Sequence, residues 1–420
     1  MTPSKPHLLL LVSTTGYTGA AFREAAAKLG VAVIVGSDRC HVLADQWPED
    51  GMLTLDFRDP ARAVEQIVSA AAARKIRAIL PSSELTATIA ARASARLGLP
   101  HNAPEGAAAA GNKALMRARL GAAAVRSPIA QTFAIAEDPC VIAERVAYPC
   151  VLKPLLLSAS RGVLRADDPR SFVAGWRRIA AILALPELLA RDPIEGAKIL
   201  VEPFVPGFEV AVEGLLSAGA LRVLAIFDKP DPLDGPYFEE TIYVTPSRLD
   251  EATQRAIGET TAAAARALGL REGPLHAELR VNDEGPWVIE VAARSIGGLC
   301  GRALRFGVDT TLEELLVRHA MGIEAIAEER EGAASGVMMI PTPRAGILER
   351  IDGVDAATRV RGIDGVTVRS LGAHVAPPPD GDAYLGFIFA RGDSPGEVES
   401  ALREAHALLV VHIAPLLTIA

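Results

Sequence analysis

Two apolar segments that carry carboxylates, HAELRV and PWVIEVAAR, follow each other closely and are joined by a short polar turn. Side chains alternate between the two faces of an extended strand. His276, Glu278 and Arg280 therefore share the polar face of the first segment, and Glu290 and Arg294 share that of the second. We predict a β-hairpin that brings these groups together. Its opposite face should be apolar and consist of Ala277, Leu279, Val281, Trp287, Ile289, Val291 and Ala293.

The turn of this hairpin decides which carboxylates face each other. A three-residue loop over 283–285, with Gly285 in the left-handed position, sets Glu278 directly opposite Glu290. A four-residue loop would instead set Glu278 against Ile289, and a bulge would shift the register by one residue. The matching of polar and apolar faces favours the three-residue loop.

Facing carboxylates repel each other, and a divalent cation between them removes that repulsion. Mg²⁺ prefers oxygen ligands and is commonly held by one or two carboxylates together with substrate phosphates. The alternative is a solvated polar face on which Arg280 and Arg294 balance the charge of Glu278 and Glu290. The hairpin by itself leaves both interpretations open.

Two lysines upstream could contact phosphate groups. Lys113 stands near the start of the helical segment GNKALMRARLG, and Lys153 ends the buried strand YPCVLKP. The strand is followed by LLLSASRGV, whose small residues, among them Gly162, would let backbone N–H groups approach an anion. The segment does not have the P-loop pattern, and a lone lysine is usually a solvated charge.

A pair of glutamates, Glu202 and Glu209, flanks the apolar dipeptide Phe204-Val205 in ILVEPFVPGFEVAVEG. A purine could stack on this dipeptide, with one carboxylate left for ribose hydroxyls. An edge strand that ends in a turn at Pro206-Gly207 would explain the same pattern without a ligand.

The elements that position these groups fall into three sections, 1–105, 106–325 and 326–420. Strands and helices alternate in the first, which predicts a doubly wound parallel sheet. The second is rich in strands and hairpins, and DKPDPLDGPY within it must be a loop. The third contains GVMMIPT, GVTVRSL and AYLGFIFA before the helical PGEVESALREAHALL, which predicts a small α+β cap.

Composition limits the class of protein. The chain has 420 residues, half of them hydrophobic, and a formal net charge of −8. An acidic chain argues against nucleic acid or an anionic membrane surface as partner. No apolar stretch is long enough to span a membrane. The four cysteines form no metal-type pair, so we expect free thiols in a reducing cytoplasm.

In chain order, these features resemble the ATP-grasp superfamily over nearly the whole length. The resemblance implies a multidomain α/β and α+β fold with a Rossmann-like N-terminal domain, a central ATP-grasp domain and a small α+β C-terminal cap. It also implies ATP and Mg²⁺ as cofactors, with Mn²⁺ as a substitute, and Glu278 and Glu290 as metal ligands. Ala292 stands where many members carry a ligating asparagine. The implied nucleotide contacts are Lys113 and Lys153 at the α- and β-phosphates, Ser160, Gly162 and Val163 in a closing loop, Glu202, Phe204 and Val205 at adenine, and Glu209 at ribose.

Within the superfamily, EVAARSIGG is similar to the corresponding segment of bacterial L-amino acid ligases of the bacilysin-synthetase type. That likeness implies peptide-bond formation between two L-amino acids through an acyl phosphate. Arg294 would bind the acyl phosphate and the oxyanion, and His276 would contact substrate or take a proton. Glu84 and Gly297 would line the amino-acid pocket, and Gly298 would leave it roomy.

Two other functions remain open. One is a carboxylase-type or purine-pathway ATP-grasp enzyme that uses bicarbonate or another small carboxylate. The other is a non-catalytic nucleotide-binding protein, which need not keep Arg294 beside the metal pair. A homodimer is the assembly that the resemblance suggests.

Overall fold

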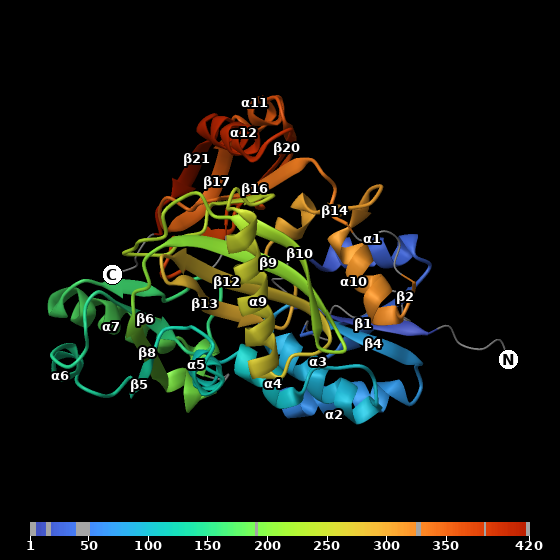
Figure 1. Cartoon of the computed structure of the whole chain (residues 1–420), viewed down its shortest axis with the longest axis horizontal. Helices are drawn as coiled ribbons and strands as arrows, with labels where there is room; N and C mark the ends of the chain where they lie inside the picture. Colours follow the sequence, from blue (N-terminus) through green and yellow to red (C-terminus); the bar gives the residue numbers. More distant parts are fainter. Residues whose placement is uncertain are drawn as a thin grey trace.

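The computed structural model describes residues 6–13, 18–38, 51–189, 192–324, 329–381 and 384–416. Figure 1 shows one large antiparallel sheet in the middle of the molecule, with the N-terminal sheet on one side and a smaller antiparallel sheet on the other. The C-terminal elements lie at the top of this view. Within these ranges, no helix is both long and apolar enough to cross a membrane.

The first section folds into the predicted parallel sheet, in the strand order β3-β2-β1-β4. Alternate side chains of its first strand pack into two different cores, Leu8 and Leu10 on one face and Leu9 and Leu11 on the other. Both faces are therefore covered, as a doubly wound sheet requires. The elements are β1 (His7–Leu11), α1 (Gly19–Lys28), β2 (Ala32–Ser37), β3 (Met52–Thr54), α2 (Pro60–Ala71), β4 (Ile76–Pro81), α3 (Glu84–Leu97) and α4 (Pro104–Ala110).

The start of the second section forms a small antiparallel sheet in the order β5-β8-β6-β7, with a core around Phe172 and Trp176. Side-chain caps fix where its helices begin. Asn112 Oδ1 accepts hydrogen bonds from the N–H groups of Ala114 (3.0 Å) and Leu115 (3.2 Å), so α5 starts at Lys113. The elements are α5 (Lys113–Ala122), β5 (Gln131–Ala134), α6 (Pro139–Ala143), β6 (Cys150–Pro154), β7 (Leu164–Ala166), α7 (Pro169–Leu183), α8 (Pro186–Leu189), η2 (Glu195–Ala197) and β8 (Lys198–Pro203).

An eight-stranded antiparallel sheet, in the order β13-β12-β9-β10-β11-β16-β20-β18, forms the centre of the molecule. Helix α9 packs on β13 and β10, and its apolar side chains complete the core behind the hairpin. The elements up to residue 324 are β9 (Phe208–Ser217), β10 (Ala220–Asp228), β11 (Ile242–Thr245), α9 (Glu251–Leu268), β12 (Gly273–Asn282), β13 (Gly285–Ala292), η3 (Cys300–Ala303), β14 (Arg305–Phe306), β15 (Thr310–Thr311) and α10 (Leu312–Met321).

The third section contains the strands and the helix that its sequence predicts, but it is not a separate layer. Three of its strands, β16, β20 and β18, extend the central sheet, and only β19-β17-β21 form a sheet of their own. The division at residue 325 therefore stays a prediction. The elements are β16 (Ala334–Ile340), β17 (Gly346–Asp352), α11 (Val354–Thr358), β18 (Ile363–Val368), β19 (His374–Val375), β20 (Gly386–Gly392), α12 (Pro395–Ala407) and β21 (Val410–Ala414).

The three cysteines in the described part of the chain, Cys140, Cys150 and Cys300, are free, as expected. Cys40 lies outside the described residues.

Candidate active site

The carboxylate hairpin forms, although its turn differs from the prediction. Asn282 pairs with Gly285, so the turn has two residues, Asp283 and Glu284, and the expected three-residue loop is wrong. A bulge between Leu279 and Glu278 then shifts the register by one residue. Glu278 consequently lies opposite Glu290, the pairing that the sequence predicts.

The bulge also changes which side chains face the core. Val288 packs in the core behind the hairpin in the place expected for Trp287 and Ile289. Ile289 instead lines the cavity on the polar side, and Trp287 lies beneath the guanidinium of Arg126. The predicted apolar face is thus wrong at these two positions.

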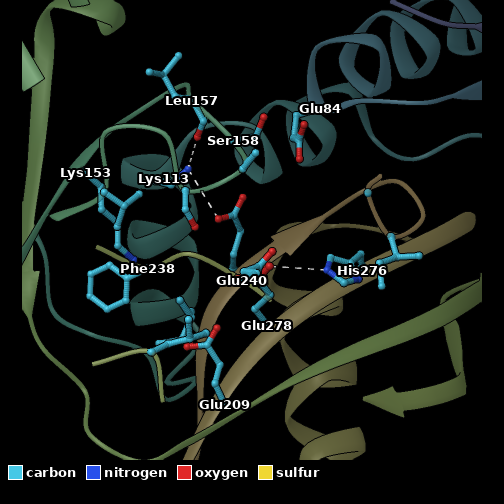
Figure 2. Close-up of a pocket in the computed structure, with 18 of the residues that line it drawn as sticks. Glu84, Lys113, Lys153, Leu157, Ser158, Glu209, Phe238, Glu240, His276 and Glu278 are labelled. Carbon is cyan, nitrogen blue, oxygen red and sulfur yellow. Dashed lines mark hydrogen bonds and ion pairs between the residues drawn. The ribbon is translucent and has the colours of Figure 1, made fainter. Parts of the chain in front are cut away.

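A cavity of about 260 Å³ lies between the polar face of the hairpin, the small antiparallel sheet and the N-terminal domain. It collects side chains from segments far apart in the sequence (Figure 2). Of the site residues predicted from sequence, those that line it are Glu84, Lys113, Lys153, Ser160, Val163, Glu202, Phe204, Val205, Glu209, His276, Glu278, Glu290, Arg294, Gly297 and Gly298.

Gly162 is the predicted site residue that does not line the cavity. Its N–H donates to the carbonyl of Pro379 (2.9 Å), and a Cβ at this position would come within 2.6 Å of Pro154. Its φ of +72° lies in the left-handed region, which favours glycine. The glycine shapes the loop, whereas its N–H is directed at the C-terminal section and not into the cavity.

One end of the cavity contains Lys113 and Lys153, and each ammonium group is held by a nearby oxygen. Lys153 Nζ lies 2.6 Å from Glu202 Oε1, and Arg117 binds the same carboxylate through Nε (2.8 Å). Burial opposes ionisation of Glu202, but Arg117 and Lys153 outweigh it and lower its pKa to about 2. Lys113 Nζ donates to the carbonyl of Leu157 (2.6 Å) and lies 3.7 Å from Glu290 Oε2. The carboxylate of Glu202 thus orients a lysine, and only its backbone is left for a purine.

Two guanidinium groups contact the ring of Phe204. The charge centres of Arg165 and Arg280 lie 4.2 and 4.8 Å from its ring centroid, and its ring lies 6.4 Å from that of Phe238. Because both arginines contact the Phe204 ring, Phe238 is the aromatic side chain best placed to meet a base. The sequence contains Phe238 in a proline-rich loop, without a periodic signal to single it out.

A lysine that the sequence prediction missed lies among the acidic groups. Lys229 Nζ lies 2.9 Å from Glu209 and 3.6 Å from Glu278, and it also bonds Glu240. The three carboxylates raise the pKa of Lys229 well above its usual value, against the effect of burial. In Figure 2 the carboxylates of Glu240 and Glu278 lie close together, and His276 is directed at them. Lys229 follows an ordinary apolar strand, so only the fold reveals its position.

The carboxylates offer two places for a cation. Ligand oxygens of Glu209, Glu240 and Glu278 lie within 4.8 Å of one another, but the ammonium of Lys229 already contacts all three. The carboxylates of the Glu278–Glu290 pair each have a different lysine nearby, Lys229 at 3.6 Å from Glu278 and Lys113 at 3.7 Å from Glu290. Both positions offer the oxygen ligands that a divalent cation prefers.

Arg294 has a different partner from the one that its sequence neighbours suggest. Its Nε donates to Glu84 Oε1 (3.0 Å), and its Nη1 donates to the Ser295 carbonyl (2.7 Å). The side chain of Ser83 caps α3, which places Glu84 in its first turn, at the cavity. Burial opposes both charges, but the pairing raises the pKa of Arg294 and lowers that of Glu84.

Gly298, four residues after this arginine, lies against an aromatic ring. A Cβ at Gly298 would lie 2.9 Å from the ring of Phe387, and φ there is +62°. The expected room beside Gly298 stays a prediction, and Phe387 limits it on one side.

His276 is held by a buried carboxylate that the sequence did not single out. Glu213 is fully buried, and its Oε2 lies 3.3 Å from His276 Nδ1 and accepts the N–H of Ile296 (3.0 Å). The other ring nitrogen of His276 lies 3.7 Å from Glu278. Glu213 thus connects His276 to the segment after Arg294.

Comparison with known proteins places each section of the chain. Residues 23–101 match the ATP-grasp N-terminal domain, residues 146–303 the ATP-grasp domain, and residues 338–414 the L-amino acid ligase C-terminal domain 2. Among solved structures, an L-amino acid ligase from Bacillus licheniformis superimposes with a TM-score of 0.82 at 26% identity, covering 98% of this chain and 100% of that one.

Two curated relatives differ in what their names describe. The alanine–anticapsin ligase of Bacillus subtilis is 30% identical over 286 residues, which cover 64% of this chain and 60% of that protein. A formate-dependent phosphoribosylglycinamide formyltransferase of Cupriavidus pinatubonensis is 25% identical over 431 residues, which cover 99% and 98%. The chain spans about 60% of the length of four of the curated relatives it matches, the ligases among them.

Proposed function

Because the chain belongs to the ATP-grasp superfamily, we propose that it is an ATP-dependent ligase that joins two L-amino acids and releases ADP and phosphate. The observation that carries the proposal is the Arg294–Glu84 ion pair, which lies in one cavity with the Glu278–Glu290 pair and the two lysines. A protein that only bound a nucleotide would not need this partly buried guanidinium in the same cavity as Glu278 and Glu290. The structural match to the Bacillus licheniformis L-amino acid ligase, which covers 98% of this chain, supports this choice.

The proposed reaction has two steps. A carboxylate oxygen of the first amino acid attacks the γ-phosphorus of ATP, and the bond from that phosphorus to ADP breaks. The ammonium of the second amino acid loses one proton, and the resulting amine attacks the acyl carbon. Phosphate then leaves with the electron pair of the C–O bond, and the nitrogen gives a second proton to solvent to form the neutral amide. Phosphoryl transfer needs mainly positioning and charge neutralisation.

The nucleotide would lie between the small antiparallel sheet and the hairpin. Lys153, fixed by Glu202, and Lys113, fixed by the Leu157 carbonyl, would contact the phosphates. The segment 158–163 would cover them, since Ser160 and Val163 line this part of the cavity. Arg280 fixes Glu209 through Nε (2.8 Å), and the free lone pairs of that carboxylate would accept ribose hydroxyls.

Glu278 and Glu290 would hold Mg²⁺, or Mn²⁺ in its place. When bound, the ion supplies neutralisation of the charge that develops on the transferred phosphoryl group. Lys229 lies closer to Glu209 and Glu240 than to Glu278, which leaves Glu278, with Glu290, as the carboxylate of the trio most available to the ion. With Ala292 in the place of an asparagine, water would complete the coordination.

The amino acids would lie near Arg294. This guanidinium is fixed by Glu84 and would bind the acyl phosphate and then the oxyanion. His276, oriented by Glu213, would take a proton from the ammonium of the second amino acid, which frees the amine for attack. Gly297 and Gly298 would border the side-chain pocket.

A purine-pathway or carboxylase-type reaction is the second candidate, because the formyltransferase relative covers almost the whole chain. In that case bicarbonate or another small carboxylate would replace the first amino acid. The cavity would still supply the lysines, the metal pair and Arg294.

Incubation with Mg-ATP and pools of L-amino acids separates these functions. We expect release of ADP and phosphate with formation of a dipeptide detected by mass spectrometry. Release of AMP and pyrophosphate would refute the acyl-phosphate route. Turnover with bicarbonate or formate, and none with any amino-acid pair, would establish the second candidate.

The metal assignment has its own test. Glu290→Gln should lower kcat at saturating ATP by about 100-fold or more, because one metal ligand is lost. Glu284→Gln, in the exposed turn of the same hairpin, is the matched control and should leave kcat unchanged. Equal turnover in both variants would contradict the assignment.

The expected homodimer is tested by sedimentation of the full chain.

A further inference from the structure

A second cavity, of about 370 Å³, lies between the N-terminal sheet, the start of β12 and the C-terminal end of α10. It shares no lining residue with the candidate active site. Pro81 and Ala293 form part of its wall, and they directly precede Ser82 and Arg294 of the first cavity. The two cavities are therefore neighbours, separated by the segments that contain these four residues.

One guanidinium group in this cavity, that of Arg318, has a buried nitrogen without an acceptor among the described residues. This nitrogen is Nε, and Nη1 reaches the Glu324 carbonyl only at 3.4 Å. Arg77 lines the same space. His319 lies next to Arg318 in the chain. Burial lowers the pKa of His319, which favours the neutral imidazole at pH 7. A buried donor without a partner is costly, and an anion would satisfy it.

A single carboxylate, Glu272, lines the cavity together with these arginines, and the backbone fixes its place. Asn102 Oδ1 accepts the N–H groups of Arg271 (2.6 Å) and Glu272 (2.8 Å). Glu272 Oε1 accepts the N–H of Ala218 (3.1 Å), and Oε2 lies 3.9 Å from His319. Its remaining lone pairs could accept hydrogen bonds from an ammonium group.

Part of the remaining wall is apolar. Ala87, Ala90 and Ala91 of α3 and Leu315 of α10 line this part, whereas Ser94, Asn102, Ser217 and Thr310 line other parts of the cavity. The apolar part leaves room for an aliphatic side chain.

We propose that this cavity binds a free α-amino acid with an aliphatic side chain, as a site separate from the candidate active site. The α-carboxylate binds Arg318 and Arg77, the ammonium binds Glu272, and the side chain packs on the alanines of α3. A ligand that fits the cavity in this way needs a carboxylate, an ammonium group and an aliphatic side chain in one molecule. The proposal goes beyond the ligase assignment and does not depend on it.

The test is calorimetric titration of the full chain with L-leucine in the absence of ATP. Arg318→Gln removes the anion contact, and Ala91→Leu fills the apolar wall without changing a charge. Arg359→Gln, at an exposed position far along the chain, is the matched control. Arg294→Lys reports binding in the candidate active site. The analogues 4-methylpentanoate and isopentylamine each lack one of the two charges.

We expect Arg318→Gln and Ala91→Leu each to weaken one class of L-leucine sites at least tenfold, with Arg359→Gln and Arg294→Lys leaving that class intact. Both analogues should bind at least tenfold more weakly than L-leucine. Unchanged binding in Arg318→Gln and Ala91→Leu, or no binding by the unaltered chain, would overturn the proposal. Loss of all binding in Arg294→Lys alone would place L-leucine only in the candidate active site, which refutes this inference and leaves the ligase proposal standing.

Discussion

His276 and Glu213 form a buried pair, with Nδ1 of the imidazole 3.3 Å from Oε2 of the carboxylate. Glu213 is fully buried, burial raises its pKa, and its Oε1 has no partner among the described residues. A buried carboxylate is costly unless a nearby group needs its charge. We infer that Glu213 is a positioning residue. It fixes the orientation of the imidazole, and by accepting the N–H of Ile296 it holds the segment that follows Arg294.

Glu213→Gln keeps the shape of this side chain and removes its charge. We expect kcat for amide formation to fall by about 10- to 100-fold, as for other orienting partners of functional histidines, with KM for ATP unchanged. The pH–rate profile should also change on its acid side, because the amide cannot titrate. Steady-state kinetics between about pH 5.5 and about pH 9 measure both effects, because this range spans the reference pKa of histidine.

The exposed Glu259 of α9 provides the control for this change. Glu259→Gln should leave kcat and the pH profile as they are. If Glu213→Gln lowered only the thermal stability and left the pH profile unchanged, Glu213 would have a purely structural role.

From the lowered pKa of Glu202 we predict that the stability of the folded chain depends on pH. Its pKa is about 2 in the folded chain, against 4.5 for an ordinary glutamate. A lowered folded-state pKa gives stability that is present above the unfolded value and is lost as the pH falls through the folded one. The difference corresponds to about 3 kcal/mol, lost between roughly pH 4.5 and pH 2.

Glu202→Gln should remove this contribution, so that the free energy of unfolding at pH 7 falls by about 3 kcal/mol and varies less at acid pH. Urea unfolding at a series of pH values measures it. Glu65→Gln, which breaks the exposed pair with Arg96, should have little effect at any pH. An equal pH dependence of unfolding in Glu202→Gln and the unaltered chain would contradict the assignment.

The sequence predicted this site best where its signals were local. The pairing of Glu278 with Glu290 was correct, although a two-residue turn and a bulge produce it, because alternation along both strands restricts the register. By contrast, Lys229 and Glu240 come from a strand end and a loop without periodicity. Their contact with Glu278 depends on β9, β10 and β12 being neighbours.

The same limit explains the partner of Arg294. Glu84 stands 210 residues earlier, in another domain, and no pattern along the chain connects the two. The sequence did single out Glu84 as a pocket residue. The structure shows that the cap and the pocket position occur together, because capping α3 places Glu84 at the cavity.

Lys229 predicts a change in metal response. Lys229→Met should leave Glu209, Glu240 and Glu278 without their ammonium and lower stability by about 3–5 kcal/mol in the presence of a chelator. Millimolar Mg²⁺ should then raise the melting temperature of the variant more than that of the unaltered chain, since the three carboxylates can accept a cation. Thermal unfolding with and without Mg²⁺ measures the difference.

Lys198→Met is the control for this effect, because Lys198 pairs with the partly exposed Glu195 outside the cavity. It should show the same Mg²⁺ response as the unaltered chain. A Lys229→Met variant that Mg²⁺ stabilises no more than this control would show that the carboxylate trio cannot take a cation in place of the lysine.

Arg294→Lys keeps the positive charge and loses the planar fork that holds Glu84 and the Ser295 carbonyl. Since the guanidinium is proposed to stabilise the acyl phosphate and the oxyanion, dipeptide formation should fall by about 100- to 1,000-fold, while KM for ATP stays the same. Parallel assays of ADP release and dipeptide yield measure this. Arg96→Lys, at the exposed Glu65 pair, is the control. Full dipeptide yield in Arg294→Lys would remove Arg294 from the reacting centre and leave it as a structural partner of Glu84.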